Sequence, residues 1–264
     1  MFGQLATIWK YKNFWLSLVI MDLRTRYRRS VLGIGWSLMN PLMMTVVFCV
    51  VFAKFFHNPD WRHSAPHFLG GMTLFEFIRG SALGGCATFF RNESYIRQYP
   101  LPLAIYTLRT VLGTAVHFMI AMGVVLASLM VLQPENAARP LAMLVVVLPS
   151  IVMLFLFCWS VAILASFMTV YFQDTQQLLE VVLQVFFFLT PIMFQSKMLI
   201  DRGLGVLLDI NPAVTFLDLI RQPLLDGNIP AMASYLRATM ILALFGATAI
   251  ATTAKLEKRM IFQL

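Results

Sequence analysis

Hydrophobic residues along this chain gather into long intervals that hold few or no charged side chains. A membrane-spanning helix needs roughly 20 predominantly apolar residues, and these intervals are long enough. The pattern predicts an all-α membrane protein that forms a single transmembrane domain over residues 1–264 and has six transmembrane helices. The predicted spans are 31–56, 67–90, 104–133, 140–171, 176–196 and 235–254.

The segments between the predicted spans have patterns of their own. Residues 1–30 place apolar side chains, including two tryptophans, on one helical face, which predicts an amphipathic helix lying at the cytoplasmic interface. Residues 91–103 are polar and form a connector. Residues 197–232 are too long and too apolar for a turn and are broken by Gly and Pro, which favours a re-entrant extracytoplasmic segment between the fifth and sixth helices. Residues 255–264 form a tail.

Composition and charge support a membrane location and set the orientation. Of 264 residues, 59% are hydrophobic and 12% are charged, whereas a soluble domain has about a quarter charged residues. The net charge of +8 and the mean hydropathy of +0.78 indicate anchoring against anionic lipid rather than nucleic-acid binding. The densest basic cluster precedes the first span and another follows the last span, so both termini are predicted to be cytoplasmic.

The sequence lacks the motifs of several enzyme classes. It has no Gly-x-x-x-x-Gly-Lys-Ser/Thr loop to hold ATP phosphates, so energy is expected from an ion gradient or from another subunit. No cysteine pair has zinc spacing, and His57, His63 and His67 have no enforced geometry, so no metal site is predicted. The carboxylates are too scattered to favour an enzyme acting on a lipid-linked sugar, and no catalytic residue is predicted.

Two charged residues lie within the second predicted span. Glu76 and Arg79 would each cost about 2.5 to 3.5 kcal/mol at a helix centre, and their spacing places them on one helical face. They could line a translocation path, form a structural ion pair or lie near the membrane rim. An ion-coupled transporter using these residues and His117 is an alternative. The candidate path residues are Glu76, Arg79, Phe48, Phe52 and Phe75.

Several motifs in this order resemble the membrane subunits of ABC exporters for bacterial surface polysaccharides, such as O-antigen, capsule and teichoic acid. The basic segment 26–42 leads into the first span. Residues 171–174 read Tyr-Phe-Gln-Asp, and residues 189–194 read Leu-Thr-Pro-Ile-Met-Phe. Residues 210–212 and 221–227 are similar to the outer segment of that family. Gln173 departs from the pattern, which has a basic residue before the aspartate.

The resemblance implies a multi-pass permease of the bacterial inner membrane that exports a lipid-linked polysaccharide in lipopolysaccharide biosynthesis. It implies a homodimer, surrounded by membrane lipids, with two copies of a separate ATPase subunit. ATP and Mg would be bound by that subunit, and this chain would bind no cofactor. Teichoic acid or a small molecule is an alternative substrate. The implied ATPase-coupling residues are Arg91, Asn92, Glu93, Tyr95, Arg97 and Asp174. The candidate outer gate is formed by Asn211, Pro212 and Arg221.

Overall fold

The structure is a computed structural model that describes residues 9–27, 33, 35–55, 61–98, 101–136, 138–194, 196–203 and 205–260. Every regular element in these ranges is a helix, which confirms the all-α class. The elements are α2 (Lys12–Tyr27), α3 (Gly35–Phe55), α4 (Trp61–Arg91), α5 (Glu93–Gln98), α6 (Ala104–Leu132), η1 (Pro134–Asn136), α7 (Ala138–Tyr171), α8 (Thr175–Leu189), α9 (Ser196–Asp201), α10 (Gly205–Ile210), α11 (Pro212–Arg221), η2 (Gln222–Asp226) and α12 (Met232–Met260).

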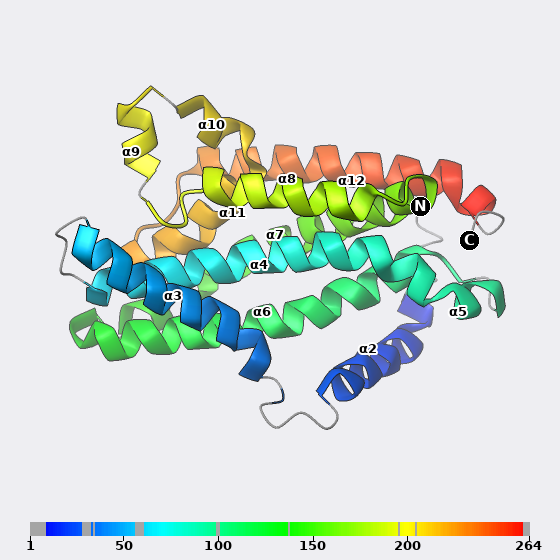
Figure 1. Cartoon of the computed structure of the whole chain (residues 1–264), viewed down its shortest axis with the longest axis horizontal. Coiled ribbons are helices and arrows are strands. Elements are labelled where there is room, and N and C mark those ends of the chain that lie inside the picture. The colour runs from blue at the N-terminus through cyan, green and yellow to red at the C-terminus, as the bar shows by residue number, and fades with distance from the viewer. Residues whose placement is uncertain are drawn as a thin grey trace.

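The long helices lie side by side along the long axis of the molecule (Figure 1). Helices α4, α6 and α7 pack against one another, α12 packs on α7, and α3 and α8 pack on α4. Helices α2 and α5 and the last turns of α12 lie at one end, which we call the α5 end. Helices α9 and α10 lie at the opposite end, which we call the α9 end.

Three helices in the described part of the chain are long and apolar enough to cross a membrane. They are α6, α7 and the Met232–Glu257 part of α12. Residues Leu38–Val51 and helix α8 are apolar but shorter. This confirms a membrane protein, while the larger number of spans expected from the sequence remains a prediction.

Helix α8 ends at Leu189, seven residues before the end of the interval predicted for the fifth span. The cause is Pro191, which has no N–H for a helical hydrogen bond and disfavours helical geometry in the residue before it. Thr190 accordingly has extended backbone angles (φ −81°, ψ 134°). The chain then turns towards the short helices of the α9 end.

The main hydrophobic core lies between α4, α6, α7 and α11. It includes Leu74, Phe77, Phe118, Leu154 and Phe216, each almost fully buried. The rings of Phe77 and Phe118 stack with centroids 4.8 Å apart. Lipid tails are as apolar as these side chains, so close packing rather than exclusion of water holds such helices together in a bilayer.

A second core cluster holds the α5 end together. Its buried members are Phe89, Ile96, Leu103, Tyr106, Ile163, Phe167, Ala249 and Met260. A six-residue helix such as α5 is not stable in isolation, so its position depends on the burial of Ile96 in this cluster. The carboxylate of Glu257 on α12 also accepts a hydrogen bond from the Leu103 N–H at 3.0 Å, which joins α12 to the start of α6.

The N-terminal helix makes a narrow contact with the bundle. Leu18 and Val19 of α2 are buried against the bundle, whereas Trp9, which precedes the turn at Tyr11, is 70% exposed and Leu16 is 43% exposed. Residues 1–8, which contribute to the predicted amphipathic face, lie outside the described residues. The same holds for residues 28–32 of the basic motif at 26–42.

Candidate functional site

The predicted coupling residues lie on and beside α5. Asn92 forms the turn between α4 and α5, and its carbonyl accepts a hydrogen bond from the Ile96 N–H at 2.9 Å. Arg91 is exposed, and Glu93 pairs with Arg97 at 2.9 Å with their side chains 41% and 53% exposed. A charged surface is therefore presented outwards from a helix anchored by its buried side. Tyr95 packs partly on the second core cluster.

Asp174 lies in the turn between α7 and α8, also at the α5 end (Figure 1). It precedes the first residue of α8 and makes no side-chain hydrogen bond that caps this helix. Its carboxylate is exposed, as is the neighbouring Phe172. The structure thus places the six predicted coupling residues at one end of the bundle.

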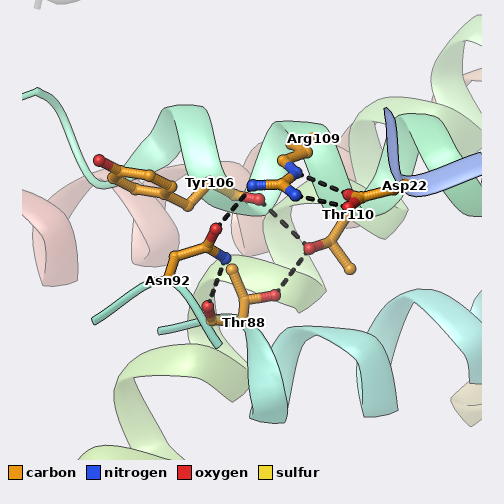
Figure 2. A network of polar contacts seen from close by, with 6 residues as sticks. All are labelled: Asp22, Thr88, Asn92, Tyr106, Arg109 and Thr110. Carbon is orange, nitrogen blue, oxygen red and sulfur yellow. Dashed lines mark hydrogen bonds and ion pairs between the residues drawn. The ribbon is translucent and has the colours of Figure 1, made fainter. Parts of the chain in front are cut away.

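Arg109 is the centre of a polar network behind the coupling residues (Figure 2). Its side chain is only about 9% exposed. The Nε atom donates to Oδ2 of Asp22 at 2.6 Å, and Nη2 donates to the other oxygen of the same carboxylate. The remaining Nη1 donates to Oδ1 of Asn92 at 2.7 Å. A buried guanidinium needs such partners, and its planar fork matches a carboxylate in two parallel bonds.

The network continues from Asn92 into α4 and α6. The Nδ2 of Asn92 donates to the carbonyl of Thr88 at 2.7 Å. The hydroxyls of Thr88 and Thr110 lie 2.9 Å apart, and the Thr110 hydroxyl also donates to the Tyr106 carbonyl at 3.2 Å (Figure 2). Helix α2, the α4–α5 turn and helix α6 are therefore joined by one set of hydrogen bonds.

Sequence reasoning identified Asn92 but missed Asp22 and Arg109. A sequence feature was available: both residues adjoin apolar runs, where a charge needs a partner. Their pairing could not be deduced, because the two residues are 87 positions apart. Several other basic residues in the same part of the chain were equally plausible partners for Asp22.

The predicted path residues are divided between the core and the surface. Glu76 is exposed on α4, Arg79 is partly buried, and no ion pair joins them in the part of the chain that the structure describes. Phe75 is buried and meets Phe187 edge-on at 5.3 Å. Phe48 lies 6.0 Å from Phe68, also edge-on. The side chain of Phe52 lies outside the described residues.

The candidate gate residues tie the α9 end together. Asn211 caps α11 by accepting from the Ala213 N–H at 3.0 Å, and its Nδ2 donates to the Thr190 hydroxyl at 2.8 Å. Pro212 occupies the first position of α11, where its missing N–H is harmless.

Arg221 lies at the other end of α11 and is only 9% exposed. It donates to the Pro191 carbonyl at 2.7 Å and to the His67 carbonyl at 3.0 Å. Arg221 therefore holds the α8–α9 connection against the beginning of α4. The structure brings the three gate residues close to the same turn, at the end of the molecule opposite the coupling residues.

A family model described as "ABC-2 type transporter" matches residues 14–225. The chain belongs to the ABC-2 type transporter family. This confirms the resemblance drawn from the sequence motifs. It makes the protein a transmembrane permease subunit of the inner membrane, in a family whose members act with an ATPase subunit.

Relatives of this ABC-2 permease include two proteins of Klebsiella pneumoniae, each named "O-antigen export system permease protein RfbA". One is 23% identical over 207 residues, covering 78% of each chain. The other is 23% identical over 209 residues, covering 79% of this chain and 78% of the relative. A protein of Myxococcus xanthus with the same name is 22% identical over 229 residues, covering 84% of both chains.

Proposed function

We propose that this ABC-2 permease exports a lipid-linked polysaccharide across the inner membrane, driven by ATP hydrolysis in a separate subunit. The observation that carries the proposal is the match to permeases named for O-antigen export, which extends over 78% or more of both partners. The family match at residues 14–225 includes the coupling residues and the gate residues.

The chain itself would bind no nucleotide and no metal. It has no phosphate-binding loop, so ATP and Mg would be held by two copies of the ATPase subunit. The α5 end is the surface that fits this partner, because Arg91, Glu93 and Arg97 are accessible while Ile96 fixes their position. Asp174 would add a contact from the α7–α8 turn.

Two copies of the chain would enclose the passage. Six spans are few for a channel that admits hydrated sugars, whereas a homodimer supplies twelve. Apolar side chains on α3 and α8 are left uncovered within one chain, including Val46, Val50, Val181 and Val185, and they suit lipid or the second copy. Glu76, Arg79 and Phe48 would lie nearest the passage, and the 197–232 segment, held by Asn211 and Arg221, would form its outer gate.

The mechanism follows from the positions of the two ends. ATP binding would close the ATPase pair and displace α5 and its surroundings. Because α4 runs from the α5 end to the contact with Arg221, a movement of α4 would reach the gate segment at the opposite end. Closing and opening the ATPase pair would then move the polymer outwards in steps.

Reconstitution of the permease with its ATPase in liposomes tests the proposal. A lipid-linked glycan on the ATPase side should become accessible on the opposite face only when ATP and Mg are supplied. Transport by the permease alone under an ion gradient would contradict the proposal and favour an ion-coupled transporter. A complex that moves teichoic acid but no O-antigen-type glycan would retain the mechanism and correct the substrate.

A further inference from the structure

We infer that Asp22, Arg109 and Asn92 form a mechanical joint that makes α2, the α4–α5 turn and α6 move as one unit when the ATPase displaces α5. The inference rests on the proposed function and adds to it a set of positioning residues. None of the three would touch substrate or nucleotide. Their role would be to determine how much of the displacement at α5 reaches the transmembrane helices.

The Arg109 side chain donates three hydrogen bonds to two partners. Arg109 of α6 uses Nε and Nη2 for Asp22 of α2 and Nη1 for Asn92 of the α4–α5 turn. Figure 2 shows the guanidinium between these two partners. Because the guanidinium is rigid and planar, a movement of Asn92 that keeps its hydrogen bond to Nη1 must also move Nε and Nη2, which bind Asp22.

Helix α2 also contacts the bundle through apolar side chains. Leu18 and Val19 are its buried hydrophobic residues among those described, and apolar contacts of this kind have little directional preference. The bond from Arg109 to Asp22 is directional and fixes the angle and register of α2. Without it, α2 could slide while remaining associated.

Asn92 lies in the turn through which a displacement of α5 would be transmitted to α4 and α6. Its carbonyl accepts from Ile96 in α5, and its side chain binds both Thr88 in α4 and Arg109 in α6. If the Arg109 network were loosened, bending at the α4–α5 turn could absorb the movement of α5. ATP would then be hydrolysed with less transport for each molecule consumed.

The matched variants are Asp22→Asn, Asp22→Glu and Glu135→Gln. Asp22→Asn removes the charge but keeps the size, and Asp22→Glu restores a carboxylate. Glu135 is an exposed carboxylate on η1, so Glu135→Gln controls for loss of one negative charge. Three quantities are measured for the reconstituted complex of each variant: the number of ATPase subunits bound per permease, the rate of ATP hydrolysis, and the glycan exported per ATP hydrolysed.

We expect Asp22→Asn to keep its ATPase subunit and most of its ATP turnover but to export about tenfold less glycan per ATP, a typical size for coupling between sites. Asp22→Glu should recover a large part of this loss, and Glu135→Gln should resemble the unaltered protein. Equal losses in Asp22→Asn and Glu135→Gln would overturn the inference. So would a parallel fall in ATP turnover and export, which indicates damage to the fold.

A distance measurement tests the joint without relying on transport. Spin labels at Leu16→Cys on α2 and Phe90→Cys on α4, both exposed sites, are introduced into the complex after replacing the native cysteines. We expect a narrow distance distribution that is unchanged by nucleotide, and a broader one in Asp22→Asn. A distance distribution in Asp22→Asn that is the same as in the unaltered complex would overturn the inference. Failure of the unaltered complex to export glycan would count against the proposed function alone.

Discussion

At the residue scale, glycine determines how closely α4 and α7 approach. A Cβ atom added at Gly85 would lie 2.7 Å from the carbonyl oxygen of Ala162 and 2.8 Å from its Cα. These are backbone atoms, so the helices would have to separate. The approach also allows the Ser166 hydroxyl to donate to the Gly85 carbonyl at 2.7 Å, and a bond between helices of this kind adds to their association in a bilayer.

Gly85→Ala should therefore destabilise the permease by about 1 to 3 kcal/mol, the usual cost of overpacking. The measurement is thermal unfolding of the purified permease in lipid nanodiscs. Gly113→Ala is the matched control, because a Cβ at Gly113 meets no atom within 4 Å and alanine favours a helix by up to about 1 kcal/mol over glycine. Equal unfolding midpoints for the two variants would contradict the claim that Gly85 determines how closely α4 and α7 approach.

At the element scale, α5 combines a buried anchor with a charged outer surface. Ile96 is 4% exposed within the second core cluster. The Glu93 to Arg97 pair is exposed, and a helical surface pair of this kind stabilises by only about 0.2 to 0.5 kcal/mol. The charges of α5 are therefore poorly explained by stability and well explained by a partner.

Reversal of one charge beside α5 should weaken binding of the ATPase subunit without unfolding the permease. Arg91→Glu reverses the charge of an exposed side chain on the proposed contact surface, and we expect the dissociation constant to rise about tenfold or more. Arg62→Glu is the control, since Arg62 is exposed at the opposite end of the same helix. Binding is measured with both permeases in nanodiscs. Equal weakening by the two variants would place the ATPase elsewhere.

The sequence predicted some elements closely and others poorly for physical reasons. Helix α6 begins at Ala104 and α7 ends at Tyr171, and the predicted spans over these helices are 104–133 and 140–171. Hydrophobic pattern defines such helices because lipid excludes charge. Helix α8 is shorter than its interval because one proline outweighs the apolar pattern. The Arg109 network could not be predicted, since periodicity places a residue on a face but does not select its partner 87 residues away.

At the scale of the whole molecule, the two ends of the bundle differ in their chemistry. The α5 end carries Arg91, Arg97 and the Arg109 network. The α9 end is held by Arg221, whose bonds go to backbone carbonyls of two other segments. Such a division suits a protein that receives a force at one end and regulates a passage at the other.

The membrane topology provides the most direct test of this arrangement. Helix α2 is tied to α6 by Asp22, and Glu257 near the end of α12 binds the Leu103 N–H at the start of the same helix. Both terminal helices therefore meet the α5 end, and from this we expect an even number of membrane crossings between them. Protease sites added before residue 1 and after residue 264 should both be cleaved in inside-out vesicles and protected in right-side-out spheroplasts.

A cysteine at Ile200, an exposed position on α9, should show the reverse behaviour with an impermeant thiol reagent, reacting in spheroplasts and not in inside-out vesicles. Its reaction from the same side as the termini would mean that α9 and α5 share a face of the membrane. The gate could not then lie opposite the ATPase. Cleavage of only one terminal site in inside-out vesicles would mean an odd number of crossings, and α2 and α12 could not both meet the ATPase end as these two bonds require.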